Sequence, residues 1–421
     1  MTTLVETSEE DPTMAVARTI ADLAWADGGH EIAGPAVAQF CNEAHAYLVD
    51  RRYPDLVNLL LTSADMVLAK TSEKDMECIF TVISNLVSKA QSPDDALAMA
   101  DQIANKLTVQ PIEKPVIRLK ILFHLYNVLE NPYGRFLIFK RVLKLAVAGK
   151  ATELVIPTFK RMDSFLFEWN ISESEKRDIF LSASNILKDQ KGYSKDSYTF
   201  LVKYLATFAG ADASTLSEAK EEAVRAIIEF VKSPDMFQKH RSGDQSIYLC
   251  DLLEMPAVKQ LGRDSKYGPV YRLLEIFLTG RLSDYLEFQT ADAATLKEYG
   301  LVHEECVTKM RLMSLVGLAA TSSGEISYAA IRDTLKVNDD EVEYWIVRAI
   351  AAKLLEAKMD QLRQVVVIGR CTERVFGPAQ WQELRSGLSG WKENINNVSR
   401  IIATAKYSQG GIPQTLQAAV H

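Results

Sequence analysis

The chain has 421 residues, 48% of them apolar and 24% charged, a balance typical of a folded protein with much to bury. A formal net charge of −7 excludes a globally basic nucleic-acid binder. Five widely spaced cysteines exclude a fully paired disulfide framework and favour reduced thiols.

The first residues, 1–12, are acidic and polar, and we expect them to form a disordered tail. They lack the basic and apolar pattern of a signal peptide. No apolar run reaches the roughly 18 residues that a membrane span needs. We therefore expect a cytoplasmic or nuclear protein without membrane contact.

Apolar residues recur at helical spacing through residues 13–301. One such face comprises Met76, Ile79, Phe80, Ile83, Leu86 and Val87. Ser172 and Glu175 have the spacing of a capping box, which starts a helix. Short connectors between amphipathic helices predict antiparallel hairpins that stack into a solenoid. The predicted fold class is all-α.

The pattern changes over residues 302–376, where we expect a winged helix. The predicted order is helix, short strand, helix, turn, helix and hairpin. Its parts are a helix carrying Leu312 and Leu315, an extended Glu325–Ser327, helices Tyr328–Leu335 and Asp339–Lys353, and strands Leu354–Lys358 and Gln364–Ile368.

The second strand of this hairpin is rich in valine, and we predict that it is an exposed edge that pairs with a neighbouring subunit. The edge residues are Gln364, Val365, Val366, Val367 and Ile368.

The helix that would read DNA in a winged helix begins with carboxylates, at Asp339, Asp340, Glu341 and Glu343. These charges would repel the phosphates that line the major groove, so we expect no DNA binding. Its apolar residues, Val342, Trp345, Ile346 and Ile350, are expected to form the packed face of the module.

A final helix is predicted over residues 377–406, followed by a disordered tail, 407–421. Its apolar residues have alternating spacings of three and four, which is the seam of a coiled coil. They are Trp381, Leu384, Leu388, Trp391, Ile395, Val398 and Ile402. We expect partner helices to cover this seam; the alternative is that the helix folds back onto its own chain.

No nucleotide-binding or catalytic motif is present in the sequence, and we expect neither an enzyme nor a cofactor. His303 and Cys306 are spaced to share one helix face, as metal ligands would be. Without a second pair of ligands, the interpretation as a helix-start histidine and a half-buried cysteine is favoured, and we expect no metal site.

Residues 112–161 contain ten basic and three acidic side chains. Within this run Lys140, Arg141 and Lys144 lie about one turn apart on one predicted helix. They are candidates for contact with RNA or with an acidic partner. A solvated basic face is the alternative.

A helical array that ends in a winged helix resembles the PCI proteins. The resemblance implies that the last helices of the array, from about residue 205, belong to the PCI domain. The likeness is carried by the helix Asp339–Lys353, the following wing segment Leu354–Gln361 and the strand Val365–Ile368. Within the family, the C-terminal third is most similar to a subunit of eukaryotic translation initiation factor 3. Segments that carry this likeness include Lys309–Leu312, Lys358–Gln361, Arg374–Gly377 and Trp391–Asn394.

This resemblance implies a non-catalytic scaffold of the factor's core, which supports recruitment of mRNA and initiator tRNA to the small ribosomal subunit. It also implies that PCI subunits join through their winged helices and that C-terminal helices bundle with those of MPN subunits. PCI subunits of the signalosome and of the proteasome lid are similar as well, so both complexes stay open as alternatives.

Overall fold

The computed structural model describes residues 11–26, 30–234, 252–372, 374 and 378–409. Apart from one small sheet the regular structure is helical, which confirms the predicted fold class. Among the described residues no helix is both long and apolar enough to cross a membrane. The predicted tails fall mostly on residues 1–10 and 410–421, which lie outside the described part of the chain.

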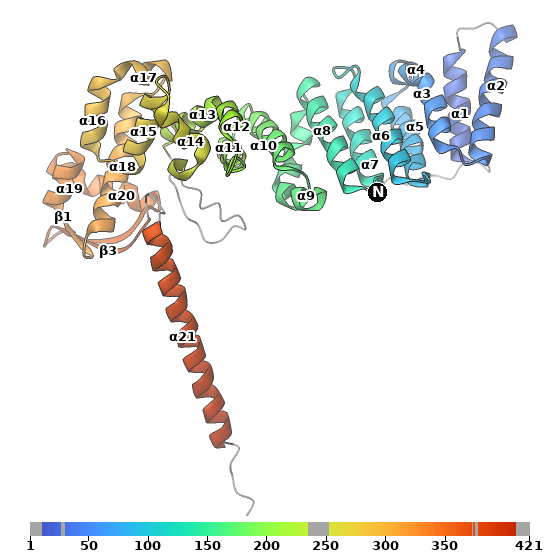
Figure 1. The fold of residues 1–421 in the computed structure, drawn as a ribbon. Coiled ribbons are helices and arrows are strands. Elements are labelled where there is room, and N and C mark those ends of the chain that lie inside the picture. The colour runs from blue at the N-terminus through green and yellow to red at the C-terminus, as the bar shows by residue number, and fades with distance from the viewer. Residues whose placement is uncertain (1–10, 27–29, 235–251, 373, 375–377, 410–421) are drawn as a thin grey trace, which may run out of the picture. The chain divides into compact units, whose positions relative to one another are not determined.

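The chain divides into two compact units, and the boundary between them in the sequence lies between Thr207 and Phe208. The helices of the first unit stand side by side in Figure 1. They are α1 (Pro12–Ala24), α2 (His30–Val49), α3 (Tyr53–Thr62), α4 (Ala64–Lys70), α5 (Glu73–Asn85), α6 (Pro93–Thr108), α7 (Pro115–Val128), α8 (Pro132–Ala148), α9 (Met162–Trp169), α10 (Glu173–Lys188) and α11 (Ser194–Ala206), with 3₁₀ turns at Leu86–Lys89, Thr152–Leu154 and Ile156–Arg161.

These helices begin where the sequence supplies caps. Ser172 and Glu175 form the predicted capping box of α10: the Glu175 amide donates to Ser172 Oγ over 3.3 Å and the Ser172 amide donates to Glu175 Oε2 over 2.9 Å. Prolines occupy the first position of α6, α7 and α8, where no intrahelical amide is needed. Pro35, in contrast, lies inside α2.

The second unit contains the remaining elements. They are α12 (Ala213–Glu218), α13 (Lys220–Lys232), α14 (Pro256–Lys259), α15 (Gly268–Leu278), α16 (Leu282–Ala291), α17 (Ala293–Glu298), α18 (His303–Thr321), β1 (Glu325–Ser327), α19 (Tyr328–Leu335), α20 (Val342–Ala351), β2 (Leu355–Asp360), β3 (Val365–Cys371) and α21 (Pro378–Gln409), with 3₁₀ turns at Leu252–Glu254, Gln260–Arg263 and Asp339–Glu341.

From α18 to β3 the order of elements is that of the predicted winged helix. Its core brings together α18, α19, α20 and the sheet. Val342 and Ile346 are fully buried in this core, and Trp345 is 5% exposed. The predicted packed face of the helix is thus confirmed, with Ile350 packed against the core as a partly buried member.

The prediction that Gln364–Ile368 is an exposed edge is wrong. The sheet order is β1-β3-β2, so β3 is central, with antiparallel neighbours on both sides. Ile326 of β1 lies opposite Val366, and Met359 of β2 lies opposite Val366 on the other side. The hairpin partner was evident in the sequence, but a three-residue strand 40 positions earlier in the chain takes up the remaining side.

Candidate interaction surfaces

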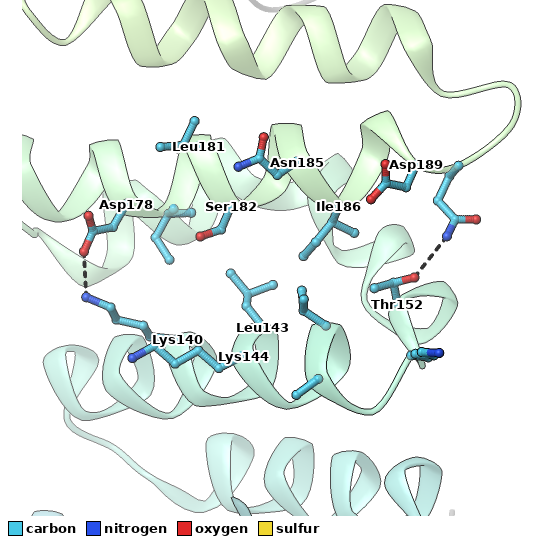
Figure 2. Close-up of a pocket in the computed structure, with 15 residues that line it drawn as sticks. Lys140, Leu143, Lys144, Thr152, Asp178, Leu181, Ser182, Asn185, Ile186 and Asp189 are labelled. Carbon is cyan, nitrogen blue, oxygen red and sulfur yellow. Dashed lines mark hydrogen bonds and ion pairs between the residues drawn. The ribbon is translucent and has the colours of Figure 1, made fainter. Parts of the chain in front are cut away.

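A groove of about 880 Å³ runs between α8 and α10 in the first unit (Figure 2). Its floor is apolar, because Leu143, Ile179 and Ile186 are each less than 5% exposed. Two contacts join its walls: Lys140 Nζ lies 2.7 Å from Asp178 Oδ2, and Gln190 Nε2 donates to Thr152 Oγ1 over 3.1 Å. The groove therefore combines an apolar base with a few polar groups on its walls, a combination typical of ligand sites.

The three candidate basic residues lie on α8 as predicted, but they do not form one patch. Arg141 turns toward α6, where it pairs with Asp101 and hydrogen-bonds Asn105. Lys140 turns toward α10 and pairs with Asp178. Lys144 is exposed on the groove wall and, among the described residues, has no ion pair. Their contact with RNA or an acidic partner stays a prediction.

Other members of the basic run serve the fold itself. Lys114 Nζ donates to the carbonyl of Thr71 over 2.7 Å, at the end of α4. Arg118, only 1% exposed, donates to the carbonyl of Leu107 near the end of α6 over 2.9 Å. Arg135 donates to the carbonyl that follows α7. Cations at helix C-termini interact favourably with the negative end of the helix dipole. The positive charges of these three residues therefore stabilise the fold and are less available to a partner.

The acidic start of α20 is engaged within the winged helix. Asp339 Oδ1 lies 3.1 Å from Arg332 Nη1 on α19. Glu343 accepts hydrogen bonds from the Tyr328 hydroxyl (3.2 Å) and from Gln361 Nε2 (2.9 Å) in the turn between β2 and β3. Asp339 thus links the start of α20 to α19, and Glu343 holds the wing turn beside α20.

The outward face of α20 presents two apolar side chains that the sequence interpretation did not single out. Tyr344 is 58% exposed and Val347 is 51% exposed. The Arg348 guanidinium lies 5.3 Å from the centre of the Trp345 ring, beside them. Leu362, in the wing turn, is 99% exposed. A spacing of three residues between Tyr344 and Val347 was the available signal for an exposed stripe.

The seam of α21 is exposed along its whole length. The seven side chains from Trp381 to Ile402 have exposed fractions between 43% and 69%. Every side chain that the structure describes between residues 384 and 404 is exposed as well. The helix is continuous across Gly387 and Gly390 and ends at Gln409, three residues beyond the predicted end. What covers the seam stays a prediction.

His303 and Cys306 face Tyr285 rather than further ligands. The Tyr285 hydroxyl lies 3.2 Å from His303 Nδ1, and the two rings stack. Burial raises the pKa of the Cys306 thiol, while its contact with Tyr285 works in the opposite direction. Within the described ranges no three His, Cys, Asp or Glu side chains gather as a metal site would require.

Two family models match the second unit. The PCI domain matches residues 284–370. A model described as the C-terminal helix of eIF3 subunit M matches residues 374–402, which include the seam of α21.

Proteins named eukaryotic translation initiation factor 3 subunit M are similar over most of the chain. The protein from Dictyostelium discoideum is 35% identical over 343 residues, which is 81% of this chain and 82% of the relative. That from Phaeosphaeria nodorum is 27% identical and covers 96% of this chain and 89% of its own. The human protein is 27% identical, with 80% of this chain and 86% of its own covered.

Proposed function

Since this chain belongs to the family of subunit M of eukaryotic translation initiation factor 3, we propose that it is a non-catalytic scaffold of that factor's core and that α21 holds partner helices. In this role it supports recruitment of mRNA and initiator tRNA to the small ribosomal subunit in the cytoplasm. Its direct partners are other PCI subunits and MPN subunits of the same complex. The names of its relatives favour this factor over the signalosome and the proteasome lid.

The observation that carries the proposal is the exposed seam of α21. Its 32 residues make a helix of about 48 Å. Each large apolar side chain contributes about 1.5–3 kcal/mol when it is covered. A stripe of seven such side chains in water is unfavourable, and exposed apolar stripes of this extent mark interaction sites. Heptad spacing selects helices as the occupants.

Deletion of residues 392–421 tests this proposal. The truncated and full-length chains, each tagged, are purified from cells, and the subunits that accompany them are quantified by mass spectrometry. We expect the truncated chain to keep its melting temperature and to lose the other subunits of the factor. A truncated chain that melts much earlier and still assembles would mean that the seam packs within its own chain.

For the winged helix, we propose that the exposed face of α20 contacts a neighbouring PCI subunit. Tyr344 and Arg348 are residue types that often carry binding energy at interfaces. Strand addition at β2 is disfavoured, because this edge has an irregular register between Glu356 and Ala357 and exposes the charged Lys358.

For the groove between α8 and α10, we propose an acidic peptide segment of a partner as the occupant, rather than RNA. Lys140 and Arg141 are already paired with carboxylates, which leaves Lys144 and Lys150 as the lining cations without an ion pair among the described residues. RNA binding requires several available cations along a phosphate chain. The apolar floor formed by Leu143 and Ile186 instead suits the apolar side chains of a peptide.

A further inference from the structure

Arg374 lies between the wing and α21, and it is held by the body of the second unit. Its Nη2 donates to the carbonyl of Phe277 over 2.9 Å. Phe277 is the penultimate residue of α15, so its carbonyl is one of the last four of that helix, which lack intrahelical partners. The guanidinium thus caps α15 and meets the negative end of its dipole.

A glycine in the C-terminal part of α18 makes room for this side chain. A Cβ atom at Gly317 would lie 3.2 Å from Arg374 Nη1 and 3.6 Å from its Cδ. Glycine inside a helix is unfavourable relative to alanine, so a close contact is a physical reason for its presence there.

The space beside Phe277 and Gly317, here called the socket, shields the Arg374 guanidinium from water. Arg374 Nε is buried and, within the described part of the chain, has no hydrogen-bond acceptor. Burial lowers the pKa of Arg374 to about 10, and the carboxylate of Asp284 works in the opposite direction. Arg374 therefore remains a cation at neutral pH, and its position is fixed by shape and by one carbonyl.

We propose that Arg374 is a positioning residue that fixes where α21 leaves the second unit, and thereby where its seam is presented to partner helices. Among the described residues, the last backbone hydrogen bond to the wing is that of the Thr372 amide, which donates to the carbonyl of Leu354 over 2.9 Å. From there to Pro378 the chain reaches about 20 Å when fully extended, whereas from Arg374 it reaches about 14 Å. When the Arg374 side chain is held in the socket, the volume that the first residue of α21 can reach is about threefold smaller.

This inference rests on the proposed function for its biological consequence, but the anchoring itself is measured on the full chain alone. Spin labels are introduced through unnatural amino acids at Gln382 on α21 and at Glu298 on α17, and their distance distribution is recorded by pulsed electron paramagnetic resonance. We expect a broader distribution in Arg374→Ala and in Gly317→Leu, whose side chain occupies the socket. The double variant should give a distance distribution no broader than that of either single variant. Arg370→Ala, an exposed arginine on β3, is the matched control and should leave the distribution unchanged.

A distribution in Arg374→Ala as narrow as that of the parent chain would overturn the inference. Assembly supplies the second arm, in which Arg374→Ala should weaken capture of the other subunits about threefold in competition with the parent chain. If deletion of residues 392–421 abolishes assembly and Arg374→Ala competes equally with the parent, the positioning role fails while the proposed function stands. If the deletion leaves assembly intact, the proposed function fails, and the anchor is judged by the distances alone.

Discussion

His124 on α7 is a half-buried imidazole whose ionisation is coupled to folding. Burial lowers the pKa of His124 below its ordinary value, and the carboxylate of Glu77 works in the opposite direction. Its Nε2 lies 3.1 Å from Asn85 Oδ1. The folded protein therefore favours the neutral ring.

We expect His124 to make the free energy of unfolding decrease as the pH is lowered. The pKa of His124 is lower in the folded chain, so the unfolded chain binds more protons as the pH drops. The stabilisation that the neutral His124 ring contributes is complete above about pH 6.5. It is lost as the pH falls toward the pKa of His124 in the folded chain. Urea denaturation at about pH 7.5 and 5.5 should show a smaller pH effect in His124→Gln than in the parent. An equal effect in both would assign the pH dependence to other groups.

Lys309 on α18 is buried, with 1% of its surface exposed. Its ammonium group donates to the carbonyls of Phe230 and Ser233, at the end of α13, and lies 4.0 Å from the centre of the Phe230 ring. It therefore links α13 to α18 within the second unit.

Replacing Lys309 with methionine should lower the free energy of unfolding by about 1–3 kcal/mol, because the two carbonyls lose their donor inside the protein. Lys297→Met, at an exposed position on α17, should stay within about 0.5 kcal/mol of the parent. Chemical denaturation measures both. Equal stability of the two variants would show that the buried cation costs as much to desolvate as it contributes.

For single residues, the sequence predicts contacts with near neighbours in the chain but not contacts with distant segments. Ser172 and Glu175 act locally, and their capping box follows from spacing alone. Lys309 and Arg374 lie in segments that resemble the family, yet their roles depend on carbonyls 76–97 positions away in the chain. A charge in a sequence does not reveal which distant helix end it caps.

Among the elements, β3 gives a matched pair of neighbouring valines. Val366 is 1% exposed and lies between β1 and β2, whereas Val367 is 38% exposed on the opposite face of the sheet. Val366→Ala should cost about 1–3 kcal/mol of unfolding free energy, because it leaves a cavity in the core of the winged helix. Val367→Ala should cost less than about 1 kcal/mol. If the two costs were equal, β3 would not have the register described.

The groove between α8 and α10 is tested at Lys144, since reversing Lys140 or Arg141 would also break ion pairs. Fluorescence anisotropy is measured with a labelled peptide of alternating glutamate and leucine and with oligouridylate, at about 0.15 M salt. We expect Lys144→Glu to weaken peptide binding about three- to tenfold, with Lys120→Glu on α7 as the unchanged control. Binding of oligouridylate that depends on Lys144, without peptide binding, would reverse the assignment.

Helices and strands were predicted well where their signals are local. Glu325–Ser327 and Tyr328–Leu335 have the bounds that were predicted. The pairing of β1 with β3 was missed because it is set by packing of the whole module, not by the hairpin.

At the scale of the whole molecule, each unit carries its own proposed surface for partners. The first unit presents the groove between α8 and α10, and the second presents the outward face of α20 and the seam of α21. The seam followed from heptad spacing, whereas the groove did not, because the residues that line it on α8 and on α10 are 30 or more positions apart in the chain. This arrangement is suited to a scaffold that holds several subunits at once.

The most direct test of this account compares two double variants of α21. Leu388→Asp with Ile395→Asp places two charges in the seam, and Ser389→Asp with Asn396→Asp places the same charges one residue further on, about 100° around the helix. All four positions are exposed, so both isolated variants should melt within about 2 °C of the parent. In purification from cells, the seam variant should lose the other subunits of the initiation factor while its control retains them. Retention of the full set of subunits by the seam variant would contradict the central claim.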